Sequence, residues 1–401
     1  MTIMKRPESL ISHLPMKKVL AGVDQLLVQE NKFQDFRLAL VTNNVASIST
    51  GESSRTALLK AGFKIIKLFS PEHGLSAKGE DGAFQSNSFD GLTHLPVISL
   101  YGDHLEPAPE ELSDIDMVLF DIPDIGCRFY TYLWTMTYVM EACAACKKPL
   151  IILDRPNPLG GDLERAEGPL LDEERCRSFI GRWNIPVRHS CTMGELATYF
   201  AAKRIMNVDL TVIKVQNWNR KQTVLEADWI FTPTSPAILD AETALLYAGM
   251  GLLEGINVNE GRGTGSPFKV CGAPWINGEQ LNRVFMDTRL PGIKSTAITY
   301  IPTHGLYAGE KCQGLRFFLT DHHLFTPVKA GLQLLQCIIS LYPGQCKERL
   351  YPTVANPTGK GHLDKLIGIY RSFEKIGEGE IPSTILQQKD WKEIISPYLL
   401  Y

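Results

Sequence analysis

Residues 63–74 read FKIIKLFSPEHG, an apolar run that stops abruptly at Pro71 and is followed by a glutamate, a histidine and a glycine. Gly74 permits a backbone turn that other residues resist, so we expect the chain to turn there. If the run is a buried strand, Glu72 and His73 lie on the loop at its carboxyl end. Ligands collect at that end of the strands in parallel α/β sheets. The stretch therefore predicts a place for chemistry, provided that the chain builds such a sheet.

Four further apolar runs resemble this one and are separated by stretches with helical patterns. They are expected as buried strands over residues 37–42, 96–101, 115–121 and 150–154. Continuous apolar strands that alternate with helices are typical of a parallel sheet covered on both faces. The sequence therefore predicts an α/β fold.

The length of the chain, 401 residues, favours two domains over one ordinary core. The character of the sequence changes after Gly255, where residues 257–265 are polar and rich in glycine, and mixed strands and helices follow. We place the boundary near residue 265. This gives a larger α/β domain over 1–265 and a smaller α+β domain over 266–401.

The composition excludes several classes of function. The net charge is −3, with both signs spread along the chain, which disfavours nucleic acid as a partner. No apolar run reaches membrane-spanning length, and the first residues show no secretory signal. The nine cysteines, Cys143 and Cys146 included, lack the spacing of a disulfide framework and are expected to be reduced. These features together predict a cytoplasmic protein.

Three acidic residues occupy comparable places in the predicted sheet. Glu72, Asp121 and Asp154 each lie at or just beyond the carboxyl end of a predicted strand. Two carboxyl groups facing a bound sugar, one of them protonated, are the usual machinery of glycoside hydrolysis. Glu72 is the best candidate for the acid, because its apolar neighbours are expected to raise its pKa. The structural alternative for each residue is a cap or a loop hydrogen bond.

Other motifs are weaker. Arg128, Arg155 and Arg262 are suited to bind a carboxylate, although salt bridges to nearby acids explain each of them singly. The glycine-rich loop 261–265 lacks the lysine of a P-loop and the spacing of a dinucleotide fingerprint. Residues 321–323 read Asp-His-His and are expected in a solvent-facing turn rather than at a metal. No Gly-x-Ser-x-Gly elbow is present in the sequence. The sequence thus predicts neither a cofactor nor a metal.

Five segments carry a likeness to a known family: residues 69–74, 120–132, 153–161, 185–189 and 260–264. Through them the sequence resembles, in order from about residue 19 to the C-terminus, the exo-β-N-acetylmuramidase family NamZ, formerly the domain of unknown function DUF1343. The resemblance implies a glycosidase that releases terminal N-acetylmuramic acid from the non-reducing end of peptidoglycan fragments. It also implies a Rossmann-like domain, a smaller C-terminal domain and a cleft between them.

The resemblance places the family's proposed catalytic glutamate on Glu72. Cys127 stands where relatives often have alanine, which is expected to affect packing only. Many relatives are exported, whereas the sequence here shows no signal. A cytoplasmic copy is expected to act on imported wall fragments.

The resemblance and the residues together give a hypothesis for the reaction. Glu72 protonates the departing glycosidic oxygen, and Asp121, or as a second choice Glu260, activates water or orients the acetamido group of the sugar. His73 positions or polarises the reacting groups and does not attack the sugar. The lactyl carboxylate of muramic acid needs a cation, which is Arg262 or Arg128. We expect the substrate to be bound by Arg128, Tyr130, Asp154, Arg155, Asn157, Glu260 and Arg262.

Two alternatives remain at this level. A sugar-binding or sensing protein would use the same cleft without turnover, and an amidase or esterase would act on the lactyl-peptide bond. The acids at the strand ends argue against the first, and the absence of a nucleophile or metal motif argues against the second. The sequence predicts neither the oligomeric state nor whether the anomeric configuration is retained.

Overall fold

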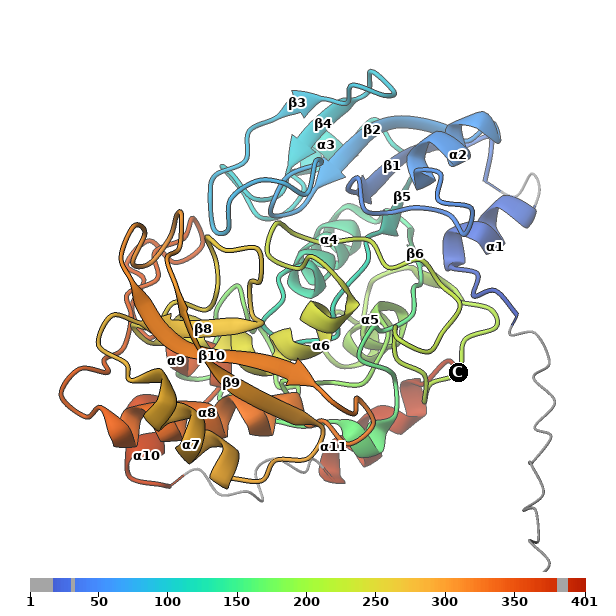
Figure 1. The fold of residues 1–401 in the computed structure, drawn as a ribbon. Coiled ribbons are helices and arrows are strands. Elements are labelled where there is room, and N and C mark those ends of the chain that lie inside the picture. The colour runs from blue at the N-terminus through green and yellow to red at the C-terminus, as the bar shows by residue number, and fades with distance from the viewer. Residues whose placement is uncertain (1–16, 30–32, 381–388) are drawn as a thin grey trace, which may run out of the picture.

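The computed structural model describes residues 17–29, 33–380 and 389–401; the start of the chain, on which the secretory-signal prediction rests, lies outside these ranges. The described chain forms two sheets with helices packed around them (Figure 1). None of the described helices is both long and apolar enough to cross a membrane.

The larger sheet has seven strands in the order β3-β4-β2-β1-β5-β6-β7, and all neighbours are parallel except β3 and β4. The strands are β1 (Arg37–Thr42), β2 (Lys64–Ser70), β3 (Ser88–Phe89), β4 (Pro96–Ser99), β5 (Met117–Asp121), β6 (Leu150–Leu153) and β7 (Leu210–Ile213). The five apolar runs are β1, β2, β4, β5 and β6, so the predicted α/β fold is confirmed. The strand order reverses between β1 and β5, where such sheets bind ligands.

Alternating side chains explain why this sheet is covered on both faces. Val41 and Phe120 join the main core, which contains residues of α4 and α5. Leu40 and Leu119 point the other way and join a second core with residues of α1 and α2. The helices of this domain are α1 (Gly22–Val28), α2 (Ser54–Lys60), α3 (Pro109–Leu112), α4 (Tyr132–Cys146) and α5 (Met193–Lys203).

The second domain contains a smaller antiparallel sheet in the order β8-β10-β9. Its strands are β8 (Val270–Ala273), β9 (Ile293–Tyr300) and β10 (Cys312–Leu319). Its helices are α7 (Gly278–Asp287), α8 (Pro327–Leu341), α9 (His362–Ile367), α10 (Ser372–Gly377) and α11 (Lys389–Ile395), and α6 (Ala241–Met250) precedes the predicted boundary. The predicted α+β character is confirmed, although β8 is short and was not predicted.

The two domains share one apolar core. The main core continues from α4 and α5 into α6 and α8, and Figure 1 shows α4 and α6 on the side of the larger sheet that faces the second domain. The helices α6 and α8 pack together at two glycines, because a Cβ atom on Gly331 would lie only 2.2 Å from the carbonyl oxygen of Gly249. A domain boundary near residue 265 stays a prediction.

Candidate active site

The loop after β2 places Glu72 and His73 at the carboxyl edge of the larger sheet. Pro71 ends the strand, and His73 and Gly74 both adopt positive φ values, 66° and 68°. Such a φ is unfavourable for a histidine and persists only where its surroundings hold it. Here the ring atom Nδ1 of His73 lies 2.8 Å from the carbonyl oxygen of Gly79. The turn carries both side chains into the interior.

Glu72 is a carboxyl group held away from water. Its side chain is buried, and its Oε1 atom accepts a hydrogen bond of 2.7 Å from the backbone N–H of Gly82. Desolvation raises the pKa of Glu72, and the nearby negative charge of Asp81 adds to this, while attraction to His73 opposes it. A raised pKa favours the protonated form of a carboxyl group, which is the form able to donate a proton.

Asp81 lies beside Glu72 but has the opposite tendency. One carboxylate oxygen from each of these two residues and one ring nitrogen of His73 lie within 4.8 Å of one another. Desolvation works against ionisation of Asp81, but Arg262, His73 and a hydrogen bond from Tyr351 outweigh it and lower the pKa of Asp81. Two neighbouring carboxyl groups with pKa values pushed apart are the pattern of an acid and an ionised partner.

Both domains contribute to the cavity in which this pair lies. The cavity has a volume of about 700 Å³, including its open mouth, and is mixed in character, with acids, aromatic rings and hydroxyl groups. From the first domain it is lined by Glu72, His73, Asp81, Tyr101, Phe129, Tyr130 and Thr131, among others. From the chain after α6 it is lined by Glu254, Arg262, Phe268, Tyr351, His362 and Lys365, among others, and all but the first two lie beyond residue 265.

Arg262 is surrounded by acids. Its Nη1 atom donates to Glu254 at 2.5 Å and to Glu260 at 2.9 Å, and its Nη2 atom lies 3.4 Å from Asp81. Its guanidinium also lies over the ring of Phe268, 4.9 Å from the centroid. The charge of Arg262 is therefore already balanced by carboxylates of the protein, which weakens the predicted pairing with a lactyl carboxylate.

Asp121 is not part of the cavity. Its side chain is fully buried at the end of β5, and its two oxygens accept hydrogen bonds of 2.7 and 3.0 Å from Nε and Nη2 of Arg155. A carboxylate that is bound in this two-point fashion has no free face for water. The placement contradicts the expectation that Asp121 activates water.

Several other predicted substrate-binding residues also have structural roles. The buried Asp154 accepts hydrogen bonds from Thr192, the Gly194 N–H and Tyr401, the last at 2.6 Å. Asn157, also buried, donates to the carbonyl oxygen of Cys191. Neither lines the cavity. These hydrogen bonds are the structural alternative stated for strand-end acids, and they explain why Asp154 is buried at the end of β6.

Arg128 and Glu260 are likewise removed from the cavity. Arg128 is fully buried and donates to four backbone carbonyl oxygens, those of Pro169, Ile185, Leu366 and Ile367, at 2.6–3.1 Å. Glu260 is buried between Arg262 and Arg349. Of the ten predicted site residues, the cavity is lined by four: Glu72, His73, Tyr130 and Arg262.

Sequence reasoning missed the residues that come from the second domain and from the loop after Glu72. Asp81, Glu254, Tyr351 and His362 lie far apart in the sequence or in polar segments without periodicity. The stacked rings of Tyr351 and His362, with centroids 4.4 Å apart, form one wall. The sequence contained one indication of a buried acid: Glu254 directly follows the apolar run of α6, and in the structure it is buried with that run.

Two groups of described side chains have the donor types of a metal site. In the first, Glu72 with His73 and Asp81, the raised pKa of Glu72 favours the protonated form, which is a poor ligand. In the second, the Glu226 carboxylate lies 3.5 and 3.2 Å from the Nε2 atoms of His322 and His323. The contacts between these side chains explain why they lie together without a metal. Both histidines belong to the predicted turn at residues 321–323.

Comparison with known sequences gives a consistent result over both domains. Residues 38–242 match the family model for the N-terminal part of the exo-β-N-acetylmuramidase NamZ, and residues 245–401 match the model for its C-terminal part. The peptidoglycan β-N-acetylmuramidase NamZ of Bacillus subtilis (strain 168) is 38% identical over 340 residues, which cover 84% of this chain and 81% of that protein.

Comparison with solved structures agrees. A crystal structure of a DUF1343 family protein from Bacteroides fragilis NCTC 9343 matches with a TM-score of 0.83 and 28% identity, covering 96% of this chain and 99% of that one. A second DUF1343 protein from the same organism, at 24% identity and a TM-score of 0.71 over the same shares of the two chains, has the same fold. The chain belongs to the exo-β-N-acetylmuramidase NamZ family.

Proposed function

We propose that this chain is an exo-β-N-acetylmuramidase that releases terminal N-acetylmuramic acid from the non-reducing end of peptidoglycan fragments. Its family membership supports the reaction class. The observation that carries the assignment of roles is the pair of Glu72 and Asp81, whose carboxyl groups lie within 4.8 Å and whose pKa values are pushed in opposite directions. Such a pair suits glycosidic bond cleavage.

In the proposed mechanism Glu72 is the general acid. Its proton passes to the glycosidic oxygen as the bond to the anomeric carbon breaks, so that the departing sugar leaves as a neutral alcohol. The ionised Asp81 stabilises the positive charge that develops on the muramyl ring. His73 holds the turn in place, and its attraction to both carboxyl groups acts to lower the pKa of each.

The short separation of the two carboxyl groups favours retention of the anomeric configuration. Inverting glycosidases keep their carboxyl groups about 6.5–9.5 Å apart to admit a water molecule, whereas retaining enzymes keep them about 5–5.5 Å apart. In this chain one oxygen of each carboxyl group lies within 4.8 Å of the other, which is closer than the spacing of inverting enzymes. We propose that Asp81 either attacks the anomeric carbon or orients the acetamido group of the substrate to do so. Water then displaces the attacking group from the anomeric carbon and gives its proton to the Glu72 carboxylate, which restores the acid. The anomer released first, observed by NMR, tests this.

The lactyl carboxylate of muramic acid requires a cation, and the geometry favours Lys365 over Arg262. Lys365 lines the cavity, and among the described residues its ammonium pairs with no carboxylate and donates only to the carbonyl oxygen of Lys360, at 3.0 Å. Burial lowers the pKa of Lys365, and a bound carboxylate would reverse that effect. Arg262 instead keeps Asp81 ionised.

Replacement of the proposed acid tests the function directly. We expect Glu72→Gln to lower kcat on the disaccharide MurNAc-GlcNAc by about 10³-fold, measured as released reducing sugar, because the amide cannot give up a proton. The exposed Glu110→Gln is the matched control and is expected to behave like the wild type. Near-normal turnover by Glu72→Gln would refute the assignment. A wild-type protein that binds the disaccharide but does not cleave it would be a sugar-binding protein.

We also propose that the protein works in the cytoplasm, on imported wall fragments. All nine cysteines are free, and all except Cys146 are buried. Unpaired thiols in such number fit a reducing compartment. Fractionation of cells with an antibody to the protein tests this, and recovery outside the cytoplasm would contradict it.

A further inference from the structure

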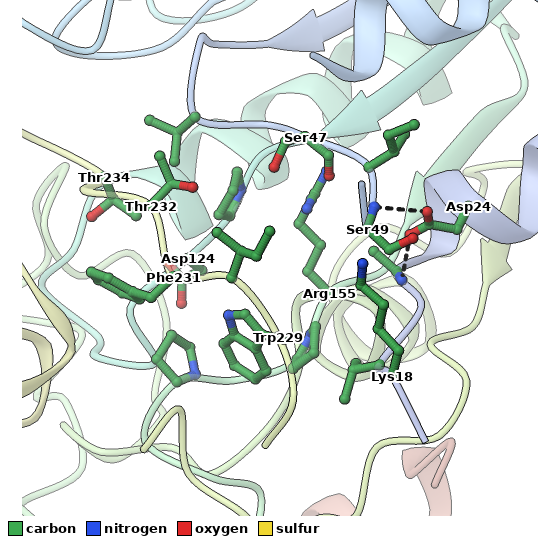
Figure 2. A pocket seen from close by; sticks show the side chains of 18 residues that line it. Lys18, Asp24, Ser47, Ser49, Asp124, Arg155, Trp229, Phe231, Thr232 and Thr234 are labelled. Atoms are coloured by element: carbon green, nitrogen blue, oxygen red, sulfur yellow. Dashed lines mark hydrogen bonds between the residues drawn. The ribbon is translucent and has the colours of Figure 1, made fainter. Parts of the chain in front are cut away.

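A second cavity opens at the carboxyl edge of the larger sheet, and the reaction proposed above does not use it. It has a volume of about 650 Å³, including its open mouth (Figure 2). Its walls come from the loops after β1, β5 and β6, at residues 45–49, 123–124 and 155–158, and from segments 18–24 and 229–234. It therefore lies at the topological switch point of the sheet, where doubly wound folds bind ligands.

One wall of this cavity carries two positive charges. The guanidinium of Arg155 is held by two hydrogen bonds to the buried Asp121 and by a hydrogen bond of 2.9 Å from Nη2 to the carbonyl oxygen of Ser47. Its Nη1 atom has no partner among the described residues. Lys18 also lines this cavity (Figure 2), and its ammonium group forms no ion pair within the described chain. A guanidinium that is held rigidly, with one nitrogen free, is suited to bind a carboxylate.

The remaining walls offer an acceptor and aromatic surfaces. Asp124 is buried, and its Oδ1 atom has no hydrogen-bond partner, while its Oδ2 atom accepts from the Gly126 N–H at 2.8 Å. A buried oxygen without a partner is costly unless a ligand donates to it. Trp229 and Phe231 supply aromatic surface on which a sugar ring packs.

The two cavities share a wall. Thr232 and Thr234 line the second cavity, and Ser235, Ala237 and Ile238 line the first. The segment 232–238 therefore contributes to both cavities.

From these observations we propose that the second cavity binds a carboxylate-bearing amino sugar. Its carboxylate pairs with Arg155 and Lys18, a hydroxyl or amide N–H donates to Asp124, and the ring packs on Trp229. A polyphosphate fits less well, because Asp124 faces it and no glycine-rich loop surrounds it. The proposal rests on the proposed function, and the source of the sugar is either the next muramyl unit of the same glycan or free N-acetylmuramic acid.

Kinetics on substrates of two lengths test the first source. We expect the wild type to prefer the tetrasaccharide (MurNAc-GlcNAc)₂ to the disaccharide MurNAc-GlcNAc by about tenfold in kcat/KM, the contribution of one charge-assisted contact. Lys18→Met and Trp229→Ala should each remove most of this preference without changing kcat/KM on the disaccharide. Lys17→Met is the matched control, because Lys17 is also exposed but does not line this cavity.

Calorimetry tests the second source. Titration of the inactive Glu72→Gln protein with N-acetylmuramic acid should give two sites, and Lys18→Met in that background should weaken one of them by about tenfold. The proposal is overturned if the variants change both substrates equally or not at all and calorimetry finds a single site. A failure of the wild type to release muramic acid would instead refute the proposed function, and the titration would still decide the chemistry of this cavity.

Discussion

The acids at the ends of β2 and β5 show how two similar positions acquire different roles. Glu72 and Asp121 are both buried at the carboxyl edge of the same sheet, with only β1 between their strands. Asp121 is bound at both oxygens by Arg155, whereas Glu72 accepts a backbone N–H and faces a cavity. Burial alone therefore does not make a strand-end acid reactive. The partner decides whether its charge is fixed or available.

Removal of the ionised acid in the cavity should have the largest effect. We expect Asp81→Asn to lower kcat on MurNAc-GlcNAc by about 10²–10³-fold, because the charge opposite the developing cation is lost. The negative charge of Asp81 raises the pKa of Glu72, so the basic limb of the residual pH–rate profile should move to lower pH. If the basic limb of the pH–rate profile did not move, the two carboxyl groups would not interact. Glu72 would then differ from Asp121 only in facing a cavity.

The same change at Asp121 should affect stability and spare catalysis. Asp121→Asn leaves Arg155 partly buried with a weakened partner, so we expect a loss of about 3 kcal/mol in the free energy of unfolding, measured with denaturant. The turnover of the disaccharide should stay within about threefold of the wild type, since the residue does not touch the cavity. Asp116→Asn, in an exposed ion pair with Arg37, is the control and should change little. A large fall in kcat for Asp121→Asn would restore its predicted catalytic role.

Lys365, whose ammonium pairs with no carboxylate among the described residues, should decide which sugar the cavity accepts. We expect Lys365→Met to reduce the preference for muramic acid glycosides over N-acetylglucosamine glycosides by about tenfold, because only the former carry a carboxylate. The comparison uses chromogenic glycosides of both sugars. Lys360→Met, which keeps the backbone carbonyl near Lys365, is the control. Equal loss on both glycosides would argue that Lys365 supports the fold of the cavity instead.

A third acid at this edge should be visible in the pH dependence of stability. Desolvation raises the pKa of Asp124 to about 7, against about 3.9 when unfolded. Its contribution to stability is therefore complete below about pH 4 and is lost as the pH rises towards 7. The neighbouring His189, whose pKa burial lowers to about 3, has the opposite effect over this range, because its unfolded form binds a proton up to about pH 6.5. Asp124→Asn should therefore make stability rise more steeply with pH than in the wild type, followed as Tm of both proteins between pH 4 and 7, and an unchanged slope would contradict the raised pKa.

The sequence was sufficient for most of the fold, because its information there is local and periodic. The apolar runs of β1, β2, β5 and β6 need no partner to be recognised, and Glu72 stood out because Pro71 and Gly74 mark the end of its strand. The position of Asp81 was not predictable, since the loop that returns it to Glu72 has no periodicity. The second domain was predicted in outline only.

Two predicted substrate-binding arginines show what the sequence leaves open. Arg128 and Arg155 stand near strand ends, where a free guanidinium would bind substrate, but the sequence does not show which partner each one has. In the structure Arg128 donates to four carbonyl groups, whereas Arg155 binds Asp121 and keeps its Nη1 atom without a partner among the described residues. Both alternatives use the same chemistry, so only the tertiary arrangement distinguishes them.

The buried guanidinium of Arg128 also has a consequence for how the protein is made. It joins carbonyl groups of residues 366–367, about 240 positions later in the chain, to those of Pro169 and Ile185. Contacts between residues so distant in sequence require a long loop to close, and the entropy lost in closing it slows folding. While a ribosome is still synthesising the second domain, the first already holds Glu72 but lacks the wall formed by Tyr351, His362 and Lys365. A nascent chain thus carries the acid without a complete cavity, and the hydrolase becomes active only once its second domain has docked.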